Sequence, residues 1–358
     1  MSAIAQVMAS LAPVASLASL ASVGTALPLQ FADALIEFLS PTTLADVIVR
    51  GIAEASLYVM IAAGLTLVFG LMGVLNFAHG SLTMLGAYLG GLVLVTVVAQ
   101  STGGAGRLLA FGVAVVVAFG ALAALGGGVE IGLVRPIYDR PPLYQILLTF
   151  GVTLVLDELA RIVVLFYGLQ PTTVWQDVLG TKPAFLADSL GVAGVSASGL
   201  ELFHILFGVA TVVGVHLFLT RTRYGLFVRA GGEDSEMLSA LGVDVNRVFT
   251  VVFALGTGIA GAAGVLLAWD PSWGASVPLA AETLLPAFVV VIVGGLGTFR
   301  GTVVAALIVG LVDSSMTWWF QNFVDFTGLP EMVVFLVLVI TLIVKPQGLY
   351  GVSEVGGH

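Results

Sequence analysis

The sequence predicts an all-α fold, a polytopic transmembrane helix bundle with about 8–10 spans, from three observations. Apolar residues make up 59% of the 358 residues, and charged residues only 9%. The mean hydropathy is +1.11. A soluble domain carries roughly 45–50% apolar and about 25% charged residues, so this chain has too little polar surface to cover a water-facing globule. The apolar residues are also grouped in stretches of about 20, the length that crosses a bilayer.

Nine stretches are candidate spans because each approaches the length needed to cross the hydrocarbon core. In chain order they cover residues 52–74, 80–99, 108–130, 144–167, 201–220, 248–269, 283–298, 301–319 and 331–345. The seventh is short, and Gly294, Gly295 and Gly297 lie near its end. This pattern predicts a half-crossing segment or a broken pair with the eighth span, because irregular backbone at membrane depth needs cover from protein or a water-filled cavity.

The chain divides into an additional N-terminal segment (1–45), a transmembrane domain (46–351) and a C-terminal tail (352–358). The first 30 residues contain no Lys or Arg, whereas a secretory signal begins with a basic region. Pro13 and several serines also disfavour a spanning helix there. The sequence favours a loosely ordered or membrane-surface leader, with an additional span as the alternative.

Basic residues are distributed unevenly between the two sides that nine alternating spans define. One side holds eight of the 12: Arg135, Arg140, Arg221, Arg223, Arg229, Arg247, Arg300 and Lys345. The other side holds three, Arg50, Arg107 and Lys182. Because cytoplasmic loops carry the excess of Lys and Arg, we expect loops 131–143 and 221–247 and the C-terminus to be cytoplasmic. The protein is then a multi-pass component of the plasma or inner membrane.

Composition excludes several classes of function. A net charge of −9 with 12 basic residues does not suit a surface that follows nucleic-acid phosphates. The chain has no Cys, and therefore no thiolate ligand and no Cys nucleophile. Its four His residues have no metal-ligand spacing. We expect no metal site and no catalytic residues, hence not an enzyme, because no nucleophile, base and orienting group converge in the sequence.

Three charged residues lie inside the predicted fourth span, where charges are costly and therefore informative. Asp157 is four residues and Glu158 three residues before Arg161, so both carboxylates can reach the guanidinium. The spacing predicts one intramembrane charge cluster, either a self-neutralising structural group or a part of a gate or path. Asp313, in the eighth span, has no partner nearby in the sequence.

A polar segment separates the first two predicted spans. Asn76, His79, Gly80 and Ser81 make a poor lipid-facing helix, and their side chains can bond backbone groups that a turn leaves free. We therefore consider these four residues candidates for a helix break or for the lining of a translocation path. A single His in such a place is more often a hydrogen-bonded structural residue than a titrating switch.

Loop 221–247 is the long polar segment of the predicted cytoplasmic side. A short helix from Glu233 to Leu241 is predicted, since acidic residues in its first turn suit the helix dipole and Gly242 follows as a C-terminal cap. Its apolar face predicts docking into a groove of another protein. The alternative is a helix that lies on the lipid surface.

Three motifs within residues 46–351 point to a known family. One is GLTLVFGLMGVLNFAHG at 64–80 with MLGAY at 84–88, and another runs from TRYG at 222–225 to ALGV at 240–243. The third is VGGLGTFRG at 293–301 with KPQGLYG at 345–351. On these motifs the chain resembles the membrane permease subunit of branched-chain amino acid ABC importers, of the LivH type within the LivH/LivM superfamily.

The resemblance implies alternating access driven by separate ATPase subunits, with a cytoplasmic coupling helix of each permease seated in a cleft of an ATPase subunit. The residues that correspond to this ATPase coupling element are Glu233, Asp234, Glu236, Met237, Leu238, Leu241 and Gly242. The chain has no Gly-x-x-x-x-Gly-Lys-Ser/Thr phosphate loop. We therefore expect no cofactor bound by this chain, and ATP used by the partner subunits.

The other partners that the resemblance implies are a second LivM-type permease or a second copy of this chain, an extracellular or periplasmic substrate-binding protein, and membrane lipid. No nucleic acid is expected. Two alternative functions stay open from the sequence. One is an ABC permease for urea, short amides or another amino acid. The other, from a different class, is an ion-coupled secondary transporter or channel that uses Asp157, Glu158 and Asp313.

Overall fold

A computed structural model describes residues 31–97, 103–168, 175, 183–192, 195–324 and 330–351. The predicted leader, Lys182 and the C-terminal tail lie outside the described residues. Nine apolar helices account for most of the described chain, and each overlaps one predicted span. They are α3 (Pro41–Met72), α4 (His79–Val97), α5 (Gly104–Val129), α6 (Pro142–Phe166), α10 (Gly199–Arg221), α13 (Val245–Trp269), α14 (Leu279–Gly294), α15 (Phe299–Trp319) and α16 (Pro330–Val344).

Six of these helices are long and apolar enough to cross a membrane: α3, α4, α5, α10, α13 and α15. The helix α6 has 25 residues but carries three charged ones, and α14 and α16 have only 16 and 15 residues. A 16-residue helix is about 24 Å long at 1.5 Å per residue, shorter than a full crossing. The predicted all-α bundle is therefore confirmed, with α14 as the predicted short element.

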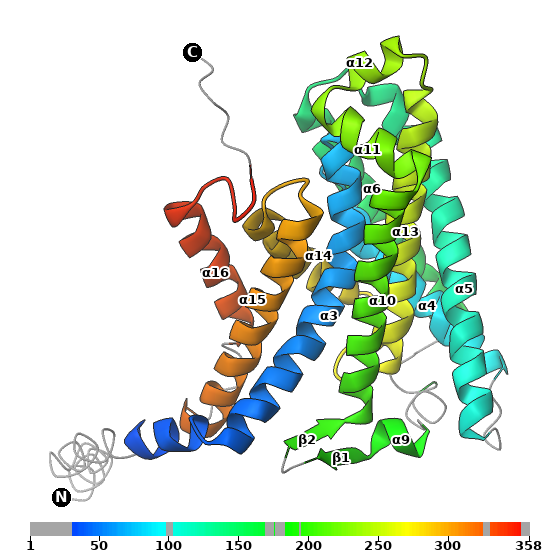
Figure 1. Cartoon of the computed structure of the whole chain (residues 1–358). Helices are drawn as coiled ribbons and strands as arrows, with labels where there is room; N and C mark the ends of the chain where they lie inside the picture. The colour runs from blue at the N-terminus through cyan, green and yellow to red at the C-terminus, as the bar shows by residue number, and fades with distance from the viewer. Residues whose placement is uncertain are drawn as a thin grey trace, which may run out of the picture.

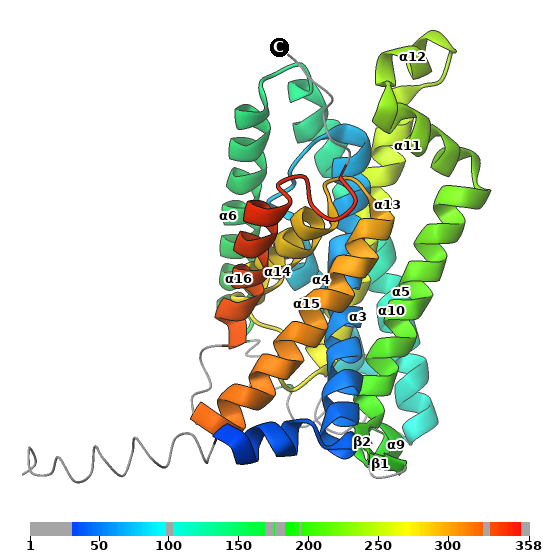
Figure 2. The same ribbon diagram turned by 60° about the vertical axis from the view of Figure 1, so that its left-hand side comes forward.

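Two helices, α3 and α13, form the centre of the bundle. Figures 1 and 2 show α3 running between α15 and α10, while α13 packs against α4 and α5. Small residues permit these contacts: Gly64 of α3 meets the backbone of Gly256, and Gly86 of α4 meets that of Gly261. These glycines thus allow the helix backbones to approach closely.

The helix α3 begins at Pro41, well before the predicted start at residue 52. Ser40 caps it, because its hydroxyl accepts a hydrogen bond from the Thr43 N–H at 3.3 Å, and Pro41 suits the first helical position. The boundary predicted at residue 45 therefore falls inside a helix. One consequence concerns Glu54, which the sequence placed at the edge of a span and which lies more than three turns inside α3.

The bundle has two distinct ends (Figure 1). The hairpin end carries α9 (Ala184–Ala187) and the two antiparallel strands β1 (Ser189–Val192) and β2 (Val195–Ser198). The α12 end carries α11 (Arg223–Glu233), α12 (Ser235–Ala240), the π-helical η2 (Glu130–Val134) and the 3₁₀ turn η3 (Arg135–Ile137). A second π-helical turn, η4 (Phe320–Val324), extends α15. The small hairpin was not predicted from the sequence.

The turn between α14 and α15 lies at the glycines where the sequence predicts an interruption. Gly295 and Gly297 have φ angles of 101° and 80°, a left-handed region that glycine adopts without steric cost. The C-terminal segment covers this turn: the Leu349 N–H donates to the Val293 carbonyl at 2.8 Å, and the Tyr350 N–H to the Gly294 carbonyl at 3.0 Å. The two parts of the third sequence motif, which are separate in the chain, thus meet in one structural element.

Candidate functional site

The predicted coupling loop is a helix pair, α11 followed by α12, rather than one helix from Glu233. Asp234 separates the two helices with an extended backbone, and its carboxylate accepts a hydrogen bond from the Met237 N–H at 2.8 Å. Asp234 is therefore the N-cap of α12, a position that favours Asp. The predicted start at Glu233 is wrong by two residues, because Glu233 is the last residue of α11.

The predicted C-terminal cap of this helix is confirmed. Gly242 has a φ of 83°. Its N–H donates to the Ser239 carbonyl at 2.9 Å, and the Val243 N–H donates to the Leu238 carbonyl at 3.4 Å. These two bonds form a Schellman motif, in which a left-handed glycine ends a helix and satisfies its last carbonyls. The direction of α12 is therefore set at both ends by short-range hydrogen bonds.

The sequence predicts one apolar face for this helix, but the apolar residues of α12 do not all lie on one exposed face. Met237 and Leu241 are 59% and 75% exposed, whereas Leu238 is only 4% exposed. Leu238 packs inward, toward the position where Gly231 of α11 lacks a side chain. Met237 and Leu241 are thus available to a partner, and Leu238 anchors α12 to the rest of the chain. Figure 1 shows α12 projecting beyond the ends of the long helices.

Glycines connect α11 to the centre of the bundle. A Cβ added to Gly231 would lie 2.9 Å from Leu71 at the end of α3, and one added to Gly232 would lie 2.7 Å from the Gly70 carbonyl oxygen. Gly70 in turn lies against Gly297, in the turn between α14 and α15. The helix pair, α3 and this turn therefore meet backbone to backbone. Beside them lies a cavity of about 780 Å³, open at the α12 end.

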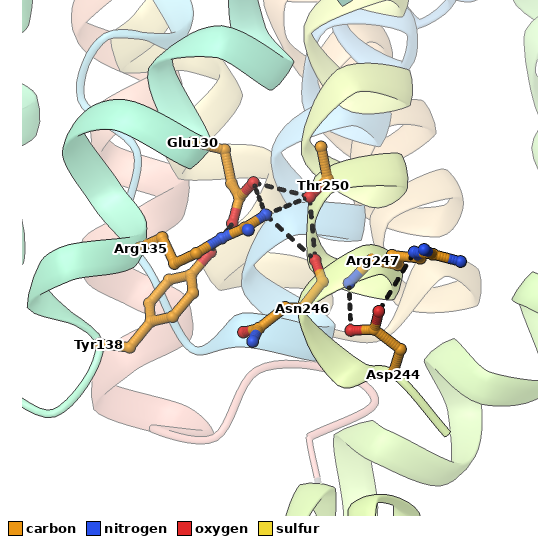
Figure 3. A network of polar contacts seen from close by, with 7 residues as sticks. All are labelled: Glu130, Arg135, Tyr138, Asp244, Asn246, Arg247 and Thr250. Carbon is orange, nitrogen blue, oxygen red and sulfur yellow. Dashed lines mark hydrogen bonds and ion pairs between the residues drawn. The ribbon is translucent and has the colours of Figure 1, made fainter. Parts of the chain in front are cut away.

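The buried carboxylate of Glu130 bonds to residues at the start of α13, the helix that follows α12 (Figure 3). Glu130 has a fully buried side chain and forms an ion pair at 2.8 Å with Arg135. Tyr138 and Thr250 also donate hydrogen bonds to Glu130, at 2.6 Å and 2.8 Å. The network joins η2 and η3 to the first turns of α13, the helix that follows α12. Burial and the hydrogen bond to Glu130 raise the pKa of Tyr138 far above its usual value, so this phenol remains a hydrogen-bond donor.

The predicted break between the first two spans is confirmed, since α3 ends at Met72 and α4 begins at His79. The Asn76 side chain accepts a hydrogen bond from the Ala78 N–H at 3.1 Å. His79 is fully buried, and its Nε2 lies 2.9 Å from the Ile61 carbonyl oxygen, so Nε2 carries the proton and donates. Gly80 packs against the backbone of Ala280. The segment thus forms the predicted helix break. Asn76, His79, Gly80 and Ser81 line neither the cavity at the α12 end nor the one at the hairpin end.

The charged residues of α6 have different partners. Arg161 lies 3.7 Å from Glu158, and both side chains are more than half exposed. Asp157 instead accepts a hydrogen bond from Ser81 of α4 at 2.6 Å. Of the expected cluster, Glu158 and Arg161 form an exposed ion pair, whereas Asp157 bonds to α4 and is still close enough to Arg161 to interact with it electrostatically. Ser81, a candidate for the path, is the α4 partner in that contact.

A second cavity, of about 660 Å³, opens at the hairpin end between α3, α10, α13 and α15. Its lining includes five carboxylates, Asp46, Glu54, Glu201, Asp270 and Asp313, together with Arg50 and His204. Asp313, which lacked a partner in sequence, accepts a hydrogen bond from Tyr58 of α3 at 2.8 Å. Sequence reasoning missed this group because its members are far apart in the chain. One signal was available. A helix start predicted at Pro41 would have placed Glu54 deep inside a span, where a carboxylate indicates a functional site.

One family model and several curated relatives match most of this chain. The family model described as "Branched-chain amino acid transport system / permease component" matches residues 47–344. The high-affinity branched-chain amino acid transport system permease protein LivH of Salmonella typhimurium is 26% identical over 311 residues, which cover 86% of this chain and 95% of that protein. The corresponding permease protein BraD of Pseudomonas aeruginosa is 26% identical over 311 residues, covering 86% and 96%. A probable LivH of Methanocaldococcus jannaschii is 26% identical over 310 residues, covering 84% and 91%.

Proposed function

Because this chain belongs to the family of permease components of branched-chain amino acid transport systems, we propose that it is the membrane-spanning subunit of an ABC importer for branched-chain amino acids. It is a multi-pass membrane transport component and not an enzyme. The match covers nearly the whole helix bundle, from the first turns of α3 to the end of α16. The relatives named above support the substrate class.

The orientation that we propose places the α12 end in the cytoplasm and the hairpin end outside, in the plasma or inner membrane. The excess of Lys and Arg in the segments at the α12 end supports this orientation. The cavity of about 780 Å³ then opens to the cytoplasm and the cavity of about 660 Å³ to the exterior. Substrate delivered by an extracellular or periplasmic binding protein would reach the exterior cavity first.

Separate ATPase subunits drive the cycle in this proposal, and α12 is the coupling element. Met237 and Leu241 supply exposed apolar contacts for an ATPase cleft. Movement of α12 passes through α11 to the end of α3, because Gly231 and Gly232 rest on Leu71 and Gly70. The helix α3 extends from this contact to the exterior cavity. The observation that carries the coupling role is the backbone contact between Gly232 of α11, the helix that precedes the exposed and doubly capped α12, and Gly70 of the central helix α3.

The partners in this proposal are two ATPase subunits, a second permease of LivM type or a second copy of this chain, and the binding protein. ATP is used by the ATPases. A decisive experiment reconstitutes the complete importer in proteoliposomes and measures uptake of L-leucine, L-isoleucine and L-valine with ATP inside. Uptake that needs ATP, both ATPases and the binding protein supports the proposal. Uptake by this chain alone, driven by an ion gradient, would contradict it.

A further inference from the structure

The innermost lining residues of the exterior cavity, which form its floor, lie deep in the bundle. Glu54 is the lining residue farthest from the hairpin end on α3, Asp313 is the farthest on α15, and His204 the farthest on α10. Glu54 lies thirteen residues after Pro41, about 20 Å along the helix at 1.5 Å per residue. Ionisable groups at such depth face a cavity or a partner charge and commonly mark substrate paths.

The other carboxylates of this cavity already have partners in the structure. Glu201 lies 3.7 Å from Arg50 and accepts the Ser198 N–H at 2.9 Å. Asp270 lies 3.6 Å from His204. Asp313 accepts the Tyr58 hydroxyl, and Asp46 also has an interaction. These groups are accounted for by contacts within the chain.

Glu54 differs from them. No hydrogen bond or ion pair to Glu54 occurs among the residues that the structure describes. The protein encloses most of its side chain, the remaining surface faces the cavity, and three other carboxylates, Asp313, Asp270 and Glu201, lie near enough to interact with it electrostatically. A buried carboxylate without a partner is costly, and neighbouring negative charges increase the cost. A cationic ligand would remove both penalties.

We propose that Glu54, at the floor of the exterior cavity, binds the α-ammonium group of the amino acid that passes through this permease. The assignment rests on the proposed function. A metal ion fits the lining less well, because Arg50 lies one helical turn from Glu54 on the same face of α3. Arg50 points to Glu201 and leaves Glu54 free. A zwitterion suits this arrangement, with its ammonium group at Glu54 and its carboxylate toward the guanidinium of Arg50.

The test compares Glu54→Gln with Glu54→Asp in the complete reconstituted importer, with Glu158→Gln as the matched control. Glu158 is also a carboxylate on a long helix, but it lies outside the cavity. The measured quantities are leucine uptake and ATP hydrolysis stimulated by the binding protein. Loss of a charge-assisted hydrogen bond predicts at least about a tenfold fall in leucine moved per ATP for Glu54→Gln. ATP hydrolysis should persist, Glu54→Asp should recover part of the uptake, and Glu158→Gln should behave as wild type.

Three results would overturn this site. One is Glu54→Gln with wild-type uptake per ATP. Another is a parallel fall of uptake and ATP hydrolysis that Glu54→Asp does not relieve, which indicates a structural role. The third is wild-type uptake that stops when choline replaces the inorganic cations outside the vesicles while Mg²⁺ and ATP stay inside, which indicates a metal-ion site. If the wild-type importer moves none of the three branched-chain amino acids, the proposed function fails instead. The variants are then assayed with the substrate it does move: an amino acid that needs Glu54 supports the site, and an uncharged substrate such as urea overturns it.

Discussion

Gly232 of α11 and Gly70 of α3 meet so closely that a Cβ on Gly232 would lie 2.7 Å from the Gly70 carbonyl oxygen. This contact joins the helix pair that we propose as the coupling segment to the most central helix of the bundle. It involves backbone on one side, so a larger side chain cannot be accommodated by a rotamer change. Any displacement of α11 toward the membrane must therefore move α3 or be resisted by it.

Gly232→Val should uncouple ATP hydrolysis from transport. The added side chain forces α11 away from α3, a change that costs about 1–3 kcal/mol in a packed contact, and we expect uptake to fall about tenfold. Binding of the ATPases should persist because Met237 and Leu241 are unchanged. Gly112→Val is the matched control, since a Cβ at Gly112 meets nothing within 4 Å. Co-purification and uptake, measured together, check this prediction; normal uptake by Gly232→Val would rule out the contact as a link.

Leu241 and Leu238 should give opposite results, although both lie on α12 or at its end. Leu241 is 75% exposed and Leu238 is 4% exposed. Leu241→Asp should abolish co-purification of the ATPases and leave thermal stability unchanged, because it alters a surface residue. Leu238→Ala should lower the stability of the α11–α12 segment by about 2–5 kcal/mol, the cost of a large-to-small core substitution. Amide hydrogen exchange of residues 223–242 measures the second effect, and unchanged exchange would show that Leu238 is not an anchor.

The main features of the fold follow from patterns that act over short distances. The nine apolar stretches, the glycine break after Gly294 and the left-handed Gly242 are set by local composition and backbone chemistry, so they were predictable. The sequence does not predict the start of α3, because residues 41–51 are mixed in polarity. Their polar side chains line the exterior cavity, which the local pattern cannot reveal.

The candidate site was only partly predictable for the same reason. The sequence places Asp234 inside the coupling helix, but Asp234 is its N-cap. One hydrogen bond, from the Met237 N–H, makes it the cap, so the helix begins two residues later than predicted. Met237 and Leu241 are exposed whereas Leu238 is buried, and this difference depends on the position of Gly231, against which Leu238 packs. The network around Glu130 joins residues more than 100 positions apart. Such contacts require the tertiary arrangement of α5 and α13.

Removal of Arg135 should destabilise the whole chain. Glu130 is fully buried, and Arg135 is its charged partner. Arg135→Met leaves a buried carboxylate with only Tyr138 and Thr250 as donors, and breaking a buried ion pair costs about 3–5 kcal/mol. Arg247→Met is the control, because Arg247 is 81% exposed in its pair with Asp244 and such pairs contribute about 0–1 kcal/mol. Thermal unfolding in detergent should separate the two variants clearly; similar midpoints would mean that Glu130 is reached by water.

The two carboxylates of α6 should also differ. Asp157 of α6 accepts a hydrogen bond from Ser81 of α4 at 2.6 Å. A hydrogen bond to a charged group contributes about 1.5–3 kcal/mol, so Asp157→Ala should loosen α6 measurably. Glu158→Ala removes only an exposed pair at 3.7 Å and should have a smaller effect. Limited proteolysis of the 138–142 turn compares them, and equal protection in both variants would remove the assigned role of the Ser81 contact.

The proposed orientation makes a prediction that the composition of the chain renders simple to test. The sequence contains no Cys, so a single introduced cysteine reports its own position without background. Ser235 begins α12, and Asp188 is an exposed residue beside β1 at the opposite end of the bundle. In intact cells, a membrane-impermeant maleimide should label Asp188→Cys and leave Ser235→Cys unlabelled. After permeabilisation both should react, which shows that each site is accessible. Labelling of Ser235→Cys before permeabilisation would show that the bundle has the opposite orientation. The helix α12 would then lie on the side without ATP and could not be the coupling element.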